Sequence, residues 1–261
     1  MRVTAIGWRA HEALTGSAGL ASVVAPLSNS FYAAAAGHLI WVGGPGTTMH
    51  PRAVLTTELA TPGEGATVRI SIDDVTPWRP ASLPSPSPRA RDAARRLRES
   101  IVRVGEPRGL ARLLIADCAD DLVLDKARSH VAALARACAE DDASAFADAA
   151  KPLLGLGPGL TPSGDDFVGG ALFARRGLVG MAPAWEAVAT RLVADAATLT
   201  HPISARLLGD LAAGEGWAPL HELAAALAAE DVERAITTAR AVTLLGHTSG
   251  WDLLAGLLTG F

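Results

Sequence analysis

The sequence predicts an α+β fold, in which a small β-rich, barrel-like domain is followed by a mainly α-helical domain. Three observations predict it. Before about residue 78, short apolar and β-branched runs end in turn residues. A Pro- and Ser-rich segment then interrupts the pattern, and beyond it alanines alternate with charges at helical spacing. We therefore expect a β-rich domain at 1–78, a linker at 79–89 and a helical domain at 90–261.

Four runs predict the strands of the first domain. Residues 38–42 lead into a glycine-rich turn, and residues 53–57 are apolar and β-branched. Residues 68–72 alternate apolar and polar side chains, which is typical of a half-buried strand. Val23 and Val24 indicate a fourth strand. The polar segment 27–32 predicts a turn before an apolar run.

The second domain contains helical patterns from residue 91 to its end. Several of them begin with a proline, which is tolerated at the first position of a helix because its missing N–H has no partner there. The predicted helices span residues 91–99, 120–140, 183–198, 202–213, 219–229 and 231–245.

Composition limits the function classes. The net charge of −4 argues against a nucleic-acid partner, which usually needs a basic face. We see no signal peptide and no apolar stretch of membrane-spanning length, so we expect a cytoplasmic protein without a membrane partner. Cys118 and Cys138 lack the spacing of a zinc site, which favours two buried thiols in a reducing compartment.

Two segments depart from the alanine-rich background. Residues 155–172 and 246–258 share the pattern Ser-Gly-x-Asp-x-x-x-Gly-x-Leu, at an offset of 86 residues. The repeat predicts two equivalent loop-to-helix corners within one domain. Its matched residues are Ser163, Gly164, Asp166, Gly170 and Leu172 in the first segment and Ser249, Gly250, Asp252, Gly256 and Leu258 in the second.

A capping box is the simplest interpretation of each Ser-x-x-Asp pair. In it, Ser163 or Ser249 occupies the N-cap and the aspartate three residues later completes the box. Capping alone does not require the glycines at positions 155, 157 and 159, which let a backbone approach a ligand. Helix N-termini also present free N–H groups that suit an anion. The corners therefore predict a small-anion site.

Asp165 and His247 are the candidate catalytic residues, since the capping box requires neither and both lie beside a predicted helix start. A third segment, 198–204, predicts a helix start capped by Thr200, with Ser204 in its first turn. We expect no metal or other cofactor, although Mg²⁺ held by the aspartates remains a minority alternative. The candidate binding residues are Gly157, Gly159, Thr161, Ser163, Gly164, Asp166, Ser204, Thr248, Ser249, Gly250 and Asp252.

Several familiar motifs are excluded. The first loop lacks the Gly-Lys-Ser/Thr of a P-loop, and its glycines do not fit G-x-G-x-x-G. Neither Ser163 nor Ser249 lies in G-x-S-x-G. The chain has two lysines, Lys126 and Lys151, and neither lies in the two motifs. An anion must therefore be met by backbone N–H groups, by an arginine such as Arg206, or by a metal.

The run Gly-Leu-Gly-Pro-Gly-Leu-Thr-Pro-Ser-Gly-Asp-Asp at 155–166 resembles the signature of a bacterial family long described as being of unknown function. That family includes the AllH-type subunit of oxamate carbamoyltransferase. Residues 246–252 resemble its second signature, and residues 200–208 are similar to a third, looser one. The β-rich part matches only in general character.

The resemblance implies a carbamoyltransferase subunit that acts with companion subunits in allantoin or purine-nitrogen breakdown, handling oxalurate, phosphate, oxamate and carbamoyl phosphate. In that interpretation the backbone of residues 157–164 stabilises developing negative charge. His247 or Asp165 orients or transfers a proton. Two alternatives stay open: a non-catalytic ligand-binding or assembly subunit, and a Mg²⁺-dependent phosphoryl-transfer enzyme.

Overall fold

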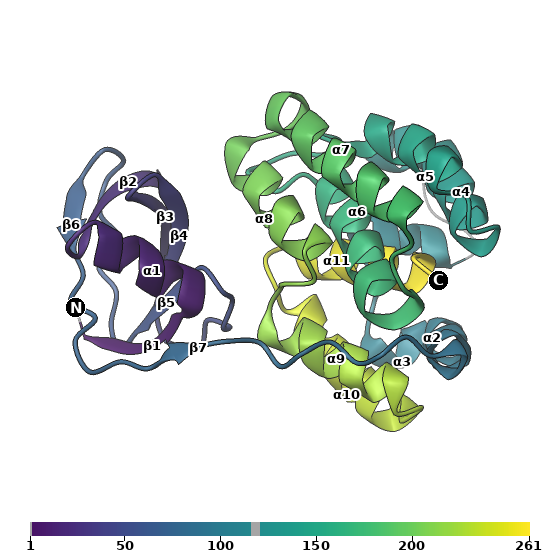
Figure 1. Cartoon of the computed structure of the whole chain (residues 1–261), viewed down its shortest axis with the longest axis horizontal. Helices are drawn as coiled ribbons and strands as arrows, with labels where there is room; N and C mark the ends of the chain where they lie inside the picture. The colour runs from purple at the N-terminus through teal and green to yellow at the C-terminus, as the bar shows by residue number, and fades with distance from the viewer. Residues whose placement is uncertain (1, 116–120) are drawn as a thin grey trace. The chain divides into compact units, whose positions relative to one another are not determined.

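The chain folds into a curled β-sheet unit followed by a mostly helical unit, which confirms the predicted fold class (Figure 1). The computed structural model describes residues 2–115 and 121–261. One compact unit contains Met1–Ala81 with Gly216–Ala218, and the other contains Ser82–Glu215 with Pro219–Phe261.

The first unit is built on a seven-stranded sheet in the order β6-β2-β3-β4-β5-β1-β7. Neighbouring strands are antiparallel except for the parallel pairs β4–β5 and β1–β7. The sheet curls into a half-barrel. Its strands are β1 (Val3–Gly7), β2 (Leu20–Pro26), β3 (Ser30–Ala35), β4 (His38–Gly43), β5 (Ala53–Thr56), β6 (Thr67–Arg69) and β7 (Pro77–Trp78).

A single helix, α1 (Trp8–Gly16), contributes to the core of this unit. Its buried residues Ala10, Ala13 and Leu14 join one apolar cluster with strand residues such as Phe31 and Ile40. Strand β2 alternates exposed and buried side chains along its whole length. This alternation is what a sheet with one buried face requires.

Most strand predictions are confirmed, and one turn is partly wrong. Residues 38–42 lie in β4, residues 53–56 in β5, and Val23 and Val24 in β2. Of the predicted strand 68–72, only residues 68 and 69 lie in a strand, β6. In the predicted turn 27–32, residues 30–32 already belong to β3, because Phe31 is fully buried and pairs with Val42 of β4. Helix α1 was not predicted, since its nine residues are too few for a clear period.

The second unit contains ten of the eleven α-helices described in residues 2–115 and 121–261, and the six predicted helical segments are confirmed within a few residues. Alanines make up much of the packed surface, which lets the helices approach closely. The helical elements are α2 (Pro88–Glu99), α3 (Ile101–Val104), η1 (Gly109–Leu114), α4 (Leu122–Ala139), α5 (Ala143–Ala150), η2 (Lys151–Leu153), α6 (Ser163–Ala174), η3 (Arg175–Val179), α7 (Pro183–Leu199), α8 (Pro202–Ala212), α9 (Ala218–Ala228), α10 (Val232–Thr243) and α11 (Ser249–Thr259).

The extended segment before α2 is held by the helical unit over part of its length. The Ser87 amide donates to the Leu178 carbonyl at 3.2 Å, and the Ser87 hydroxyl accepts from the Arg89 amide at the start of α2. Leu83 packs so closely on Gly177 that a Cβ there would meet its side chain at 2.9 Å. These contacts anchor residues 83–87 to the helical unit.

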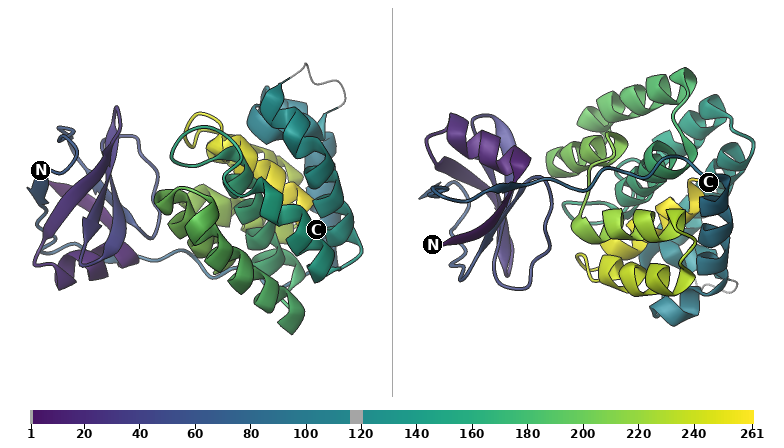
Figure 2. Two further views of the ribbon diagram at one scale, coloured as in Figure 1. Left: turned by 90° about the horizontal axis from the view of Figure 1, so that it is seen from above. Right: turned by 60° about the horizontal axis from the view of Figure 1, so that its bottom comes forward.

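Helices α6 and α11 pack against each other and form the centre of the helical unit, with other helices around them (Figures 1 and 2). Every residue of α6 is buried, and so is every residue of α11 after Ser249. A helix that is buried on all sides is expected to be apolar all round. Both helices nevertheless carry aspartates in their first turns, which makes those turns the unusual part of the core.

Among the described residues, no helix has both the length and the apolarity needed to span a bilayer.

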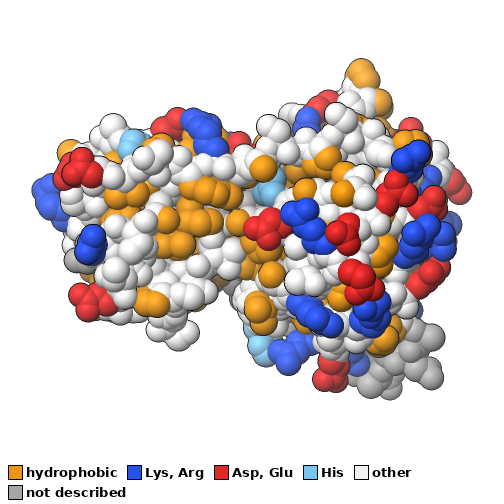
Figure 3. Space-filling model, turned by 90° about the horizontal axis from the view of Figure 1, so that it is seen from below, with side chains coloured by type: hydrophobic (Ala, Val, Ile, Leu, Met, Phe, Trp, Pro, Cys, Tyr) orange, Lys and Arg blue, Asp and Glu red, His pale blue; other side chains and the backbone are white. Residues whose placement is uncertain are grey.

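Burial raises the pKa of the Cys138 thiol to about 12, which makes this cysteine unreactive. Cys118 lies outside the described residues. Acidic and basic side chains are interspersed on the face of the helical unit seen in Figure 3.

Candidate functional site

The two Ser-Gly-x-Asp corners lie at the first turns of α6 and α11, as the repeat predicts. The capping-box interpretation is wrong in its detail. The N-cap residues are Pro162 and Thr248, and neither helix has a side-chain hydrogen bond at its cap. Ser163 and Ser249 are already the first helical residues, so their hydroxyls are available for other partners.

The serines instead exchange partners across the contact between the two helices. The Ser163 hydroxyl hydrogen-bonds Asp252 of α11, and the Ser249 hydroxyl hydrogen-bonds Asp166 of α6. The hydroxyl oxygens of Thr161 and Ser249 lie 3.0 Å apart, which joins the first loop to the second corner. The serine of each motif therefore supplies a hydrogen-bond partner to the aspartate of the other motif.

The glycines of the two motifs permit this arrangement. A Cβ on Gly170 of α6 would lie 2.2 Å from the Leu253 carbonyl oxygen of α11. A Cβ on Gly256 of α11 would lie 1.9 Å from the Phe167 carbonyl oxygen of α6. Both separations are too short for any side-chain carbon, so the backbones meet where only glycine fits. The contacts are related by the same 86-residue offset as the motifs.

Asp252 has two further hydrogen-bond partners that the motifs did not predict, the Leu110 amide and the Thr248 side chain. Its Oδ1 accepts the Leu110 amide of η1 at 2.6 Å. A Cβ on Gly109, which has φ +53°, would lie 2.2 Å from the same oxygen. Thr248 adds a side-chain hydrogen bond to this carboxylate. The sequence marks this contact with a glycine before two apolar residues, at 109–111. No local pattern connects that glycine to Asp252, which lies far along the chain.

Burial raises the pKa of both paired aspartates. For Asp252 desolvation is the main cause, and hydrogen bonds from Leu110, Ser163 and Thr248 oppose it, which leaves the pKa at about 6. The pKa of Asp166 rises well above its usual range, because the charge of Asp252 adds to the effect of burial. In the part of the chain that the structure describes, the Oδ2 atoms of Asp166 and Asp252 have no hydrogen-bond partner.

Asp165 joins the three segments that the sequence singled out. Its Oδ1 accepts the Gly155 amide of the glycine loop at 2.8 Å. Its Oδ2 accepts the hydroxyl of Ser204 at 2.7 Å and that of Thr200. Burial still raises the Asp165 pKa, although these three hydrogen bonds oppose the rise. The carboxylate is 1% exposed, so its geometry is that of a positioning group.

Thr200 consequently does not cap α8, which corrects the prediction for that segment. The cap of α8 is His201, whose Nδ1 accepts the Ile203 amide at 3.2 Å, and Pro202 follows it as predicted. Ser204 lies in the first turn of α8, as predicted, and is buried. The third segment thus contributes two hydroxyls to the Asp165 junction.

The glycine loop presents free backbone N–H groups. Gly155, Gly157 and Gly159 have φ of +76°, +122° and +90°, a region that glycine adopts readily. Among the described residues, the amides of Gly157, Gly159, Leu160 and Thr161 have no hydrogen-bond partner. Nothing lies within 4 Å of a Cβ position on Gly159, so the tip of the loop is open. Free backbone amides in such a loop can receive an anion.

The second loop is the exposed side of the site. His247 is exposed, while Thr248 and Ser249 are half-buried. Gly250 is buried against the Val242 carbonyl, where a Cβ would lie only 2.0 Å away, and Gly164 is buried in the same way against Leu153. Of the predicted site residues, the two motif glycines Gly164 and Gly250 therefore pack the corners, whereas Gly159 and His247 are exposed.

Metal binding has limited support from the geometry. No group of three or more His, Cys, Asp or Glu side chains that could hold a metal occurs within residues 2–115 and 121–261. Asp166 and Asp252 supply two free oxygens, so Mg²⁺ would need water or substrate phosphate to complete its octahedral coordination.

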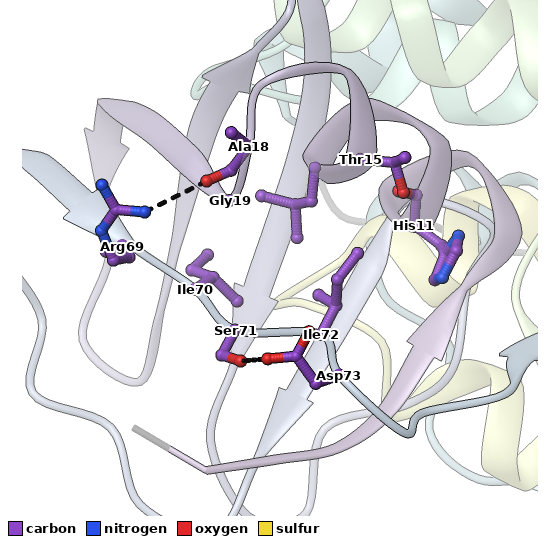
Figure 4. A pocket seen from close by; sticks show the side chains of 10 residues that line it. His11, Thr15, Ala18, Gly19, Arg69, Ile70, Ser71, Ile72 and Asp73 are labelled. Carbon is purple, nitrogen blue, oxygen red and sulfur yellow. Dashed lines mark hydrogen bonds between the residues drawn. The ribbon is translucent and has the colours of Figure 1, made fainter.

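Cavities occur elsewhere in the molecule. One of about 630 Å³ lies in the β-rich unit between the end of α1 and residues 69–73 (Figure 4). Its polar lining includes His11, Thr15 and Arg69, and the Arg69 guanidinium donates to the Ala18 carbonyl. None of the predicted site residues lines this cavity, and no sequence pattern predicted it.

Comparison with known proteins relates part of the chain to a described family. A family model described as oxamate carbamoyltransferase subunit AllH matches residues 153–261. The matched range contains both Ser-Gly-x-Asp motifs and the third segment, which confirms the predicted resemblance for this part of the chain. No curated protein and no solved structure matches the chain.

Proposed function

Because residues 153–261 match the AllH-type subunit, we propose that this protein is a subunit of an oxamate carbamoyltransferase that works with companion subunits. The observation that carries the proposal is the match itself, since it spans the three segments that meet at Asp165 and at the α6–α11 contact. The substrates in this proposal are oxamate or oxalurate with carbamoyl phosphate or phosphate, and the setting is cytoplasmic allantoin or purine-nitrogen breakdown.

In this proposal the glycine loop binds the anionic group. The free amides of Gly157, Gly159, Leu160 and Thr161 lie beside the N-terminus of α6. Helix N-termini and free amides favour negative charge, and they stabilise charge that develops on a phosphate or carboxylate oxygen. The buried carboxylates limit this effect, since Asp166 and Asp252 occupy the first turns of the same helices.

The two candidate catalytic residues, Asp165 and His247, have different roles in this proposal. Asp165 has both oxygens engaged, so in this proposal it holds the glycine loop against α8. His247 is exposed on the second loop, which leaves it free to orient the substrate or to move a proton. His247 is therefore the better candidate for contact with substrate.

One observation favours the alternative of a binding or assembly subunit. The carboxylates of all three motif aspartates are buried and serve contacts between helices or loops, as a purely structural junction also requires. An assembly subunit would bind the anion to set its contact with partner chains, while a companion performs the transfer.

The experiment that tests the proposal measures phosphorolysis of oxalurate by the chain alone, by its companion subunits alone, and by the mixture. We expect activity in the mixture and its loss in the mixture that contains His247→Ala. Glu140→Ala, at an exposed position on the far end of α4, is the control and should leave activity unchanged. Full activity of the companions without this chain would contradict the proposal. Activity of the mixture that His247→Ala does not change would favour the assembly alternative.

A further inference from the structure

The β-rich unit contains a cavity that the proposed function does not use. Its volume is about 630 Å³, and it lies between α1 and residues 69–73, the segment in which edge strand β6 ends (Figure 4). Pockets for small molecules are typically on the order of 300–1,000 Å³, so this cavity has room for a small metabolite. The family match begins at residue 153 and therefore does not describe it.

One wall of the cavity is a face of α1. His11, Leu14 and Thr15 have helical spacing, so their side chains lie on the same side of the helix. Leu14 is fully buried and makes part of this wall apolar. The Thr15 hydroxyl donates to the His11 carbonyl at 2.8 Å, which leaves the hydroxyl oxygen as an acceptor. The wall thus supplies apolar contact and polar groups, but no acidic side chain.

The other wall is the segment 69–73, which passes close to the end of α1. The Ile70 amide donates to the Gly19 carbonyl at 2.8 Å, and a Cβ on Gly19 would lie 2.6 Å from the Ile70 carbonyl oxygen. Only glycine permits so close an approach. Ile70 is buried and Ile72 is half-buried, whereas residues 69, 71 and 73 are exposed. The polar side chains of this segment therefore line the cavity where it opens to solvent.

Opposite charges lie at the two ends of this segment. Arg69 Nη1 donates to the Ala18 carbonyl at 3.2 Å, and the guanidinium has further N–H donors for a ligand. Asp73 accepts the Ser71 hydroxyl at Oδ2, which leaves Oδ1 as an acceptor. Figure 4 shows Arg69 beside Ala18 and, apart from them, Asp73 beside Ser71. The Cα atoms of Arg69 and Asp73 are at most about 14 Å apart, so one extended small molecule reaches both side chains.

We propose that this cavity binds an elongated small zwitterion of the ω-amino acid class, with a carboxylate at one end and an ammonium group at the other. The carboxylate accepts N–H groups of Arg69, and the ammonium group donates to the Asp73 carboxylate. The apolar stem of the ligand packs on Leu14 and Ile72, which lie on the two walls.

The charges of the cavity favour a ligand with both groups over a ligand with either one alone. Within residues 2–115 and 121–261, neither Arg69 nor Asp73 has an ion-pair partner, so both charges are available to a ligand. Each end of a zwitterion then forms a charge-assisted hydrogen bond. A simple carboxylate or a simple amine satisfies one end and meets a charge of its own sign at the other.

Titration of the ¹⁵N-labelled full chain with 6-aminohexanoate tests this proposal by amide NMR shifts. We expect saturable shifts at Gly19, Ser71 and Asp73, which line the cavity. Hexanoate and hexylamine each lack one of the two charges and should bind on the order of tenfold more weakly. Equal affinities for the three probes, no saturable shift at these amides, or shifts confined to the glycine loop 155–161 would overturn the proposal.

Two variants identify which side chain binds which end of the probe. Arg69→Ala should weaken the binding of 6-aminohexanoate on the order of tenfold and should not weaken that of hexylamine. Asp73→Asn should weaken the binding of 6-aminohexanoate by a similar factor and should not weaken that of hexanoate. Both side chains are exposed, so neither substitution leaves a void in the core, and circular dichroism checks that each variant is folded.

Matched controls remove the same charges outside the cavity. Arg2→Ala and Asp74→Asn change exposed residues of the same unit that do not line it. Asn tolerates the φ of +62° at position 74. Both controls should bind the three probes as the wild type does. The proposal fails if Arg69→Ala and Asp73→Asn bind 6-aminohexanoate as tightly as the controls, or if the controls lose as much affinity as they do.

Discussion

At the scale of single residues, Asp165 joins three segments of the site through its two carboxylate oxygens. Its two oxygens accept from the glycine loop and from both hydroxyls of the third segment. The sequence indicated that a capping box does not require Asp165, which is correct. It did not indicate that the hydroxyls of Thr200 and Ser204 would donate to Asp165. Those partners come from a helix start 35 or more residues away, so their meeting depends on tertiary packing.

Removing the Asp165 carboxylate should destabilise the helical unit. Asp165→Ala leaves the half-buried Gly155 amide and two hydroxyls without their acceptor, which we expect to lower the free energy of unfolding by about 2–4 kcal/mol. Denaturant unfolding measures this directly. Asp148→Ala, exposed on α5, is the control and should change little. An Asp165→Ala protein as stable as the wild type would mean that the junction is dispensable.

The raised pKa of Asp252 makes the free energy of unfolding fall as the pH rises. A carboxylate whose pKa is lowered by folding has the opposite effect. Its pKa in the folded protein is raised from 3.8 to about 6, so folding favours the protonated form. The stabilising contribution is complete below about pH 4 and is lost as the pH rises through 6. The lowered pKa of Asp141, paired with Arg175, acts with the opposite sign in the acid range.

Comparison of the wild type with Asp252→Asn isolates this contribution. Asn keeps the oxygen that accepts the Leu110 amide and carries no charge. Between pH 4 and pH 8, the wild type should lose about 3 kcal/mol of stability relative to the variant. Urea unfolding at several pH values provides the measurement. A difference that stays constant across this range, or that grows with pH, would be inconsistent with a raised Asp252 pKa.

At the scale of elements, the contact between α6 and α11 determines the site. The sequence repeat predicted two equivalent corners, and the structure brings them together through Gly170 and Gly256. The local capping rule failed here because Pro162 and Thr248 occupy the caps, and the serines face the opposite helix. A rule that considers one helix at a time does not contain the information that another helix supplies the partner.

The helix contact is tested by adding one methyl group. Gly256→Ala places a Cβ 1.9 Å from the Phe167 carbonyl oxygen, so α6 and α11 must separate. We expect a loss of about 3 kcal/mol or more in unfolding free energy, as for severe overpacking. Gly209→Ala on α8 is the matched control, because its Cβ would lie 3.5 Å from Val193, an ordinary contact. Its expected change is zero or a gain of about 1 kcal/mol from helix propensity.

At the scale of the whole molecule, the division into a β-rich and a helical unit followed from periodicity and the Pro/Ser segment, because these patterns are local. The cavity of about 630 Å³ beside α1 could not be predicted, since it depends on how the end of a short helix meets an edge strand. The family match is confined to residues 153–261. We therefore propose that the two corner loops of the helical unit bind the anionic substrate of carbamoyl transfer.

The most direct test of that claim is a titration of the ¹⁵N-labelled full chain with carbamoyl phosphate, followed by amide NMR shifts. We expect the amides of Gly157, Gly159, Leu160 and Thr161 to shift with saturation, since they are the free donors of the loop. Amides of the β-rich core, such as Ile40, should stay in place. Saturable shifts confined to the β-rich unit, or none in the glycine loop at any concentration, would contradict the claim.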